Sequence, residues 1–249
     1  MALLNLLKKP MKKNASNNQA IYFLTELRTR LIYSCIVLFI LLAVFLYFAN
    51  HLYTILAYPL LKFLPEGHLI ATQIISPFMV PFKLAFLAAF LTAIPFFLYQ
   101  LWCFIAPALY GYERRLIWPF LLASTVLFYA GMAFAYLIIF PMLFRFLARI
   151  APVGVVLSPD INEYLGFSIQ LLMVFGVVFE IPIAMVVLVF ANIVSRSRLI
   201  KMRSYAILGA FIIGMLFAPP DVFSQTVLAI PIWLLYEAGL ILTKFVERK

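Results

Sequence analysis

The sequence predicts an all-α, polytopic membrane protein with six membrane-spanning helices. Of its 249 residues, 66% are hydrophobic and 11% are charged, whereas about a quarter of an ordinary soluble domain is charged. The apolar residues form long runs, and about 20 such residues are enough to cross a bilayer as a helix. The basic residues gather at the ends of these runs, where they determine the orientation of the spans.

The chain is predicted to divide into a basic tail at residues 1–19, a membrane domain at 20–243 and a short tail at 244–249. The first tail does not resemble a secretory signal, because its apolar run is short and its basic residues follow that run. Pro10 and the Asn/Ser cluster after it are expected to prevent a stable helix through to the end of this tail. We therefore predict that residues 1–19 are mobile.

A leading helix and three spans are predicted in the first half of the membrane domain. Apolar residues at helical spacing mark the leading helix at residues 20–30, which runs into span 1 at 31–48. A loop containing prolines and glycine follows. Span 2, at residues 78–105, contains two prolines, which kink a membrane helix unless neighbours satisfy the freed carbonyl groups. Span 3 is predicted at residues 116–143, with a proline near each end.

The second half is predicted to hold span 4 at residues 164–191 and two short spans at 204–218 and 222–236. Fifteen residues cover about 22 Å at 1.5 Å per residue, whereas the hydrocarbon core is about 30 Å thick. Either the bilayer thins locally or a partner covers this mismatch, or the true spans extend into their polar flanks. The sequence leaves both interpretations open.

Both chain termini are predicted to lie in the cytoplasm. Most of the 19 lysines and arginines fall in the two tails and in the connections after spans 2 and 4. The positive-inside rule places these segments on the cytoplasmic side, and an even number of spans agrees with it. The net charge of +10 therefore reflects membrane topology, and no nucleic-acid partner is expected.

Patterns typical of enzymes and cofactor sites are missing from the sequence. Two cysteines and two histidines, distant from one another, cannot form an ordinary tetrahedral zinc site. The sequence has neither a glycine-rich nucleotide motif nor a pair of aspartates within spans. We expect no catalytic residue, metal or cofactor.

Two carboxylates, Glu26 and Glu113, are predicted at the cytoplasmic membrane boundary. Carboxylates bind guanidinium groups in bidentate fashion, which makes both residues candidates for recognising arginine in a ligand. The alternative is local neutralisation, of Glu26 by Arg30 four residues later and of Glu113 by the adjacent Arg114 and Arg115. Exposed local pairs contribute only about 0.3–0.5 kcal/mol, so an incoming ligand could displace them.

Polar residues within the spans are further candidates. Glu180 lies in the middle of an apolar run, where a charge costs about 2.5–3.5 kcal/mol, and we favour a polar, water-accessible patch there over a purely structural contact. Lys83 either extends its ammonium group toward the membrane surface or pairs with Glu180. Gln225 is either a functional polar contact or a partner in a helix–helix hydrogen bond.

Four segments together resemble the TatC family, the polytopic subunit of the twin-arginine protein translocase. They occur in the family's order and at its membrane positions, and the resemblance covers approximately residues 20–243. The segments are ELRTRL at 26–31, YQLWCFIAPALYGYERR at 99–115, FGVVFEIP at 175–182 and PPDVFSQTVLAIP at 219–231.

This resemblance implies a fold and a function. The six helices would form a curved, glove-like arrangement in the bacterial cytoplasmic membrane, and would export folded proteins using the proton-motive force. The passengers would carry signal peptides with a consecutive Arg-Arg pair. Expected partners are TatA-like and TatB-like single-span proteins, other copies of this chain and the lipid bilayer.

The resemblance also implies roles for individual residues. The signal-recognition carboxylates fall on Glu26 and Glu113, and the supporting residues are Arg28, Arg30, Phe104, Pro107 and Tyr110. The family's buried acidic residue falls on Glu180, its first-loop proline on Pro59 and its outer-turn aspartate on Asp221. The last two spans, including Gln225, resemble the docking region for the single-span partners.

A different class of function remains as an alternative. Glu180 and the proline-broken helices would also suit an ion-coupled secondary transporter of a small solute. Such a protein would take up its substrate in proteoliposomes that contain this chain alone, whereas a translocase receptor would not.

Overall fold

The computed structural model describes residues 11–48, 75–105, 117–150, 160–218 and 220–246, and all its secondary-structure elements are helices. Five helical stretches of this part of the chain are long and apolar enough to cross a membrane, and α9 is a shorter apolar helix. The elements are α1 (Met11–Tyr47), α3 (Ser76–Ile105), α4 (Ile117–Phe134), the π-helix η3 (Ala135–Ile139), α5 (Phe140–Ile150), α6 (Ile161–Val178), α7 (Ile181–Phe190), α8 (Arg196–Lys201), α9 (Arg203–Phe217) and α10 (Val222–Val246).

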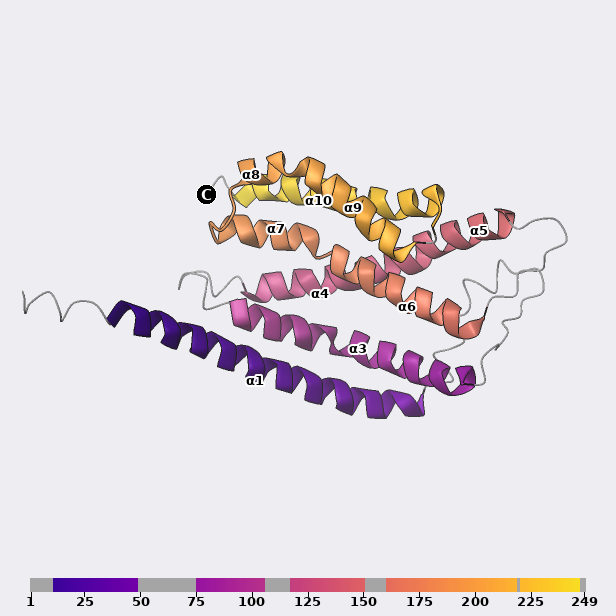
Figure 1. Cartoon of the computed structure of the whole chain (residues 1–249), viewed down its shortest axis with the longest axis horizontal. Helices are drawn as coiled ribbons and strands as arrows, with labels where there is room; N and C mark the ends of the chain where they lie inside the picture. Colours follow the sequence, from indigo (N-terminus) through magenta and orange to yellow (C-terminus); the bar gives the residue numbers. More distant parts are fainter. Residues whose placement is uncertain (1–10, 49–74, 106–116, 151–159, 219, 247–249) are drawn as a thin grey trace, which may run out of the picture.

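The helices lie side by side and alternate in direction (Figure 1). Helix α1 packs along α3, which also contacts α4 and α6, while α10 packs on α7 and α9. The main core lies between α3, the α4–α5 stretch and α6, and its fully buried side chains include Leu84, Phe140, Leu165 and Phe175. By contrast, none of the most apolar window of α1 is buried. Lipid is therefore expected to cover most of the α1 surface.

Helix α1 begins earlier than we predicted. It starts at Met11, directly after Pro10, and runs through the Asn/Ser cluster without a break to Tyr47. The expectation that this cluster prevents a helix is wrong, because extending an already formed helix by one residue costs far less than nucleating one. The predicted leading helix and span 1 are therefore one element.

Span 3 is longer than predicted and changes its winding on the way. The helical stretch from Trp118 continues to Ile150, past Pro141, where we expected it to end soon after. The five-residue π-helix η3 comes just before that proline, and the Phe140 N–H accordingly bonds to the carbonyl of Ala135. A wider turn relieves the clash of a proline ring with the preceding turn of a helix, so the chain passes Pro141 without stopping.

Span 4 consists of two helices that meet at Phe179 and Glu180. The Glu180 N–H bonds to the carbonyl of Val177, three residues back, which tightens the turn. Pro182 then occupies the first turn of α7, a position where its missing N–H is not needed. Glu180 therefore lies at a helix junction in the middle of the span.

We predicted two short spans at the end of the chain, and only the first of them is short in the structure. Helix α9 has 15 residues as expected, but α10 has 25 and passes the predicted end at Tyr236. Its last turns are stabilised by packing: Leu240 and Thr243 are buried, and the Tyr236 hydroxyl donates to the carbonyl of Leu199 at 2.7 Å. The mismatch with the bilayer thickness therefore concerns α9 alone.

Candidate recognition site on α1 and α3

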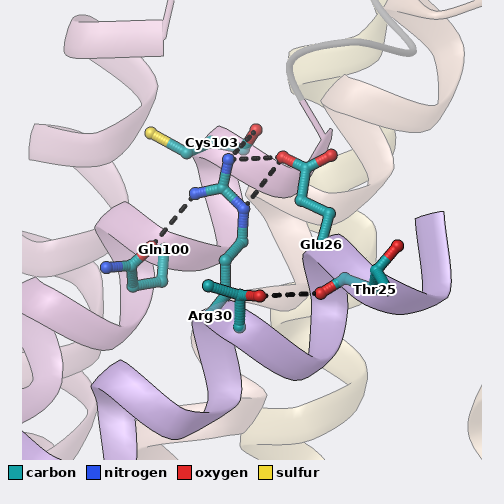
Figure 2. Close-up of polar contacts among 6 residues, drawn as sticks. Thr25, Glu26, Arg30, Gln100 and Cys103 are labelled. Atoms are coloured by element: carbon teal, nitrogen blue, oxygen red, sulfur yellow. Dashed lines mark hydrogen bonds and ion pairs between the residues drawn. The ribbon is translucent and has the colours of Figure 1, made fainter. Parts of the chain in front are cut away.

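The carboxylate of Glu26 is bound by Arg30, one turn further along α1 (Figure 2). Arg30 Nη2 and Nε donate to Glu26 Oε1 at 2.6 and 3.1 Å. This is the local pairing considered from the sequence, but it is not an exposed pair. The side chains of Arg30 and Glu26 are 24% and 18% exposed, so the pair is screened less by water than surface pairs are.

Arg30 also ties α1 to α3. Its Nη1 donates to Gln100 Oε1 at 3.0 Å, and its Nη2 reaches the carbonyl of Cys103 at 3.3 Å. The last carbonyls of a helix have no partner within the helix, and Cys103 lies in the last turn of α3. Arg30 satisfies one of them. We call Glu26, Arg30, Gln100 and the Cys103 carbonyl the α1–α3 clamp.

Two members of the clamp were not predicted from the sequence. Gln100 is one of few polar residues in a predominantly apolar helix, which is a usable signal because polar side chains in membrane helices form hydrogen bonds to neighbouring helices. Cys103 acts through its backbone, and a backbone contact leaves no trace in residue identity. The clamp changes the expected cost of displacing Arg30, since four hydrogen bonds rather than one exposed ion pair would have to break.

One oxygen of the Glu26 carboxylate has unused capacity to accept hydrogen bonds. Its Oε2 atom is buried and has no hydrogen-bond partner among the described residues. An ionised carboxylate accepts about four hydrogen bonds, and the Arg30 contacts use Oε1 alone. A further cationic donor could therefore bind at Oε2 without displacing Arg30, once the groups that cover this atom move aside.

An apolar groove adjoins the clamp between α1 and α3. It has a volume of about 430 Å³ and shares Arg30 and Gln100 with the clamp. The predicted site residue Phe104 lines it near this polar end. Its remaining walls are side chains of the two helices, namely Leu27, Leu31, Ser34, Cys35, Leu38, Phe90, Phe97, Leu98 and Leu101. The site thus combines a carboxylate with an extended apolar surface.

The other predicted site residues fall into two groups. Arg28 lies on α1 with an exposed side chain, two residues from Glu26. Glu113, Pro107, Tyr110 and Pro59 lie outside the described residues. Whether Glu113 stands beside Glu26 therefore stays a prediction.

Glu180 is half-buried, and its surroundings connect it to α3 and α4. The Ser124 hydroxyl hydrogen-bonds to its carboxyl group, and Trp102 Nε1 donates to Ser124 Oγ at 3.3 Å. Its Oε1 atom is buried without a partner among the described residues. The ion pair between Lys83 and Glu180, one of the two alternatives considered from the sequence, is not formed, because Lys83 Nζ donates to Asn162 Oδ1 at 2.6 Å instead. A water-accessible patch at Glu180 stays a prediction.

Gln225 and Asp221 make structural contacts at the turn between α9 and α10. Gln225 Nε2 donates to the carbonyl of Phe211 on α9 at 3.1 Å, so the helix–helix hydrogen bond considered from the sequence is present. Asp221 Oδ2 accepts the Ser224 N–H at 2.6 Å and so caps the start of α10. Neither contact tests the functional role that the resemblance implies.

The fold and the site together define a polytopic α-helical membrane protein in which a carboxylate adjoins an apolar groove between α1 and α3. A family model described as "Sec-independent protein translocase protein (TatC)" matches residues 22–231. The chain belongs to the TatC family.

Individual relatives agree with this assignment. The chain is 50% identical over 223 residues to the "Sec-independent protein translocase protein TatC" of Escherichia coli K12, covering 89% of this chain and 86% of the relative. The protein of the same name from Haemophilus influenzae is 47% identical over 227 residues, with 91% and 89% covered. A solved structure titled "Crystal Structure of Twin Arginine Translocase Receptor- TatC" superimposes with a TM-score of 0.82 at 39% identity, covering 90% of this chain and 99% of that one. The predicted all-α polytopic fold is confirmed.

Proposed function

We propose that this chain is the signal-peptide receptor and core subunit of a twin-arginine translocase, which exports folded proteins across the bacterial cytoplasmic membrane. The observation that carries the proposal is the buried Oε2 oxygen of Glu26, which has no hydrogen-bond partner among the described residues, beside an apolar groove. A signal peptide with an Arg-Arg pair followed by an apolar segment has the complementary chemistry. Membership of the TatC family supports the same conclusion. No observation favours the small-solute transporter.

The geometry of the clamp supports the following recognition step. One guanidinium of the signal peptide binds Glu26 Oε2, while Arg30 stays bound to Oε1 and holds the carboxylate in place. The second guanidinium binds Glu113, which follows α3 in the sequence. The apolar segment of the peptide lies along the groove, where it leaves water for contacts with Leu31, Leu38 and Phe97.

Orientation and partners complete the proposal. Both termini lie in the cytoplasm, which places the clamp where precursor proteins arrive. TatA-like and TatB-like single-span helices dock beside α9 and α10, where the 15 residues of α9 leave the bilayer locally mismatched. Other copies of the chain join the same complex, and the proton-motive force drives transport.

The variant Glu26→Gln tests the recognition step. The glutamine amide keeps an oxygen acceptor for Arg30 and removes the charge that a second guanidinium needs, so the fold should survive while recognition fails. We expect photo-crosslinking of an Arg-Arg signal peptide to the full chain to fall at least tenfold, because a charge-assisted hydrogen bond contributes about 1.5–3 kcal/mol.

The matched control is Glu237→Gln. Glu237 also pairs with an arginine, Arg203 at 2.8 Å, but on α9 and α10, away from the groove. This variant should crosslink like the wild type, and a Lys-Lys signal peptide should crosslink weakly to every variant. The proposed site would be rejected if Glu26→Gln, both alone and combined with Glu113→Gln, crosslinked the Arg-Arg signal peptide with the same yield as the wild type.

A further inference from the structure

We propose that a groove at the end of α5 binds the headgroup of an anionic phospholipid. The groove lies on the membrane face opposite Glu26. This site is independent of the proposed recognition of signal peptides. Its volume is about 530 Å³, and it contains both a charged and an apolar part. It is lined by Leu137, Ile138, Pro141, Met142, Arg145, Phe146, Arg149 and Phe223.

The two arginines form the charged part of the groove. Arg145 and Arg149 are four residues apart on α5, so their side chains leave the same face of the helix about 6 Å apart along its axis. Both side chains are exposed. Arg149 makes no hydrogen bond or ion pair within the described ranges. Arg145 does make a polar or electrostatic contact, but a guanidinium has five N–H donors and can bind a ligand in addition. The pair thus presents two adjacent cations to a ligand.

The position along the helix places this pair at the level of lipid headgroups. The stretch Trp118–Ile150 has 33 residues, about 50 Å of helix, whereas the hydrocarbon core is about 30 Å thick. Trp118 is 71% exposed and marks the opposite interface, where tryptophan is enriched. About 20 to 25 residues beyond it the helix leaves the hydrocarbon, so Arg145 and Arg149 follow just outside. Figure 1 shows α5 ending on the side opposite the start of α1.

The apolar part of the groove extends back toward the membrane centre. Leu137 and Ile138 are 67% and 45% exposed and lie about 10–12 Å before Arg145 along the helix. Phe223, at the start of α10, stacks on Phe146 with ring centroids 4.0 Å apart, which forms one wall. An acyl chain attached to a headgroup at the arginines would pass along these side chains.

The combination identifies the ligand as a lipid rather than a soluble anion. Arginine binds phosphate through paired N–H donors, and two cations favour a headgroup with net negative charge over a zwitterionic one. Basic pockets between membrane helices on the cytoplasmic side bind anionic headgroups, and we extend the same chemistry to the arginine pair on the other face. A free phosphate would gain nothing from the exposed apolar wall at headgroup depth. Phosphatidylglycerol therefore has the matching chemistry.

Native mass spectrometry of the full chain in detergent tests the site, with dioleoyl phosphatidylglycerol and dioleoyl phosphatidylcholine as probes. We expect the wild type to retain phosphatidylglycerol preferentially. The double variant Arg145→Gln/Arg149→Gln should bind it roughly 30-fold more weakly, since each surface cation contributes about fivefold. The control Arg198→Gln/Lys201→Gln removes two exposed cations of α8 and should bind like the wild type.

A second variant separates loss of the site from loss of the fold. Met142→Trp fills the groove and leaves both arginines, so it should also lose phosphatidylglycerol while its thermal unfolding without lipid matches that of the wild type. Three results would overturn the proposal: equal retention by the double variant, equal binding of the two lipids, or displacement of the lipid by inorganic phosphate at matching concentration.

Discussion

The helix pairs at the two sides of the molecule are joined in different ways. Helices α1 and α3 meet through the polar α1–α3 clamp and leave an apolar groove of about 430 Å³ between them. Helices α9 and α10 approach so closely that a Cβ atom on Gly214 would lie 2.9 Å from the carbonyl oxygen of Gln225. The first interface is held at one end and open along its length, whereas the second is closed.

This difference suggests how the molecule divides its tasks. An interface that is fixed by a few polar contacts can admit an apolar segment along the rest of its length without losing its own packing. A close-packed interface loses dispersion contacts as soon as anything enters it. We therefore expect a ligand to bind between α1 and α3. We expect α9 and α10 to form a rigid pair that admits nothing between its helices but can contact other helices through its outer surfaces.

Enlarging Gly214 should produce the largest effect. In Gly214→Leu the new side chain meets the backbone of Gln225, which cannot move aside like the end of a flexible side chain. We expect destabilisation of about 1–3 kcal/mol or more, the usual range for overpacking, measured as a lower midpoint of thermal unfolding in detergent. Gly209→Leu on the same helix is the control, because a Cβ there has no neighbour within 4 Å. Equal midpoints for the two variants would show that the α9–α10 interface is not closed.

Removing Arg30 should produce an intermediate effect. Arg30→Gln leaves the half-buried Glu26 carboxylate without its cation and loses the bonds to Gln100 and Cys103. Breaking one partner of such a pair costs less than the 3–5 kcal/mol of a fully buried pair, and we expect about 1–2 kcal/mol in the same unfolding measurement. Arg28→Gln changes an exposed arginine two positions away and should leave the midpoint unchanged. Equal unfolding midpoints for Arg30→Gln and Arg28→Gln would show that the clamp does not stabilise the fold.

The contrast between the two interfaces also shows what the sequence could predict. Hydrophobic runs and basic flanks were sufficient for the helical membrane fold, and the spacing of Glu26 and Arg30 predicted their pairing. The role of Gln100 required knowing which face of α3 meets α1, which depends on tertiary packing. The close contact at Gly214 likewise depends on the angle between α9 and α10, and a glycine in a membrane helix does not reveal that by itself.

The boundaries that were wrong have a common cause. Pro141 and the Asn/Ser cluster near Pro10 are local signals for ending a helix, and both were overridden. A π-turn absorbed the first, and the low cost of extending a formed helix outweighed the second. The true end of α10 depends on contacts with Leu199 and α7 that lie far away in sequence. Local propensity therefore located the helices, whereas packing determined where they stop.

Filling the open groove should have the smallest effect on stability. Cys35 lines the groove and is exposed, so Cys35→Trp places a large apolar ring in existing space, and we expect the unfolding midpoint to stay within the range of surface substitutions, about 0.5 kcal/mol. Crosslinking of an Arg-Arg signal peptide should nevertheless fall several-fold, because the ring occupies the path of the apolar segment. Ile36→Trp alters the next residue, which is 48% exposed and not part of the groove lining, and should change neither measurement. A loss of stability as large as that of Gly214→Leu would mean that the α1–α3 interface is as closed as α9–α10, whereas undiminished crosslinking would mean that the signal peptide lies elsewhere.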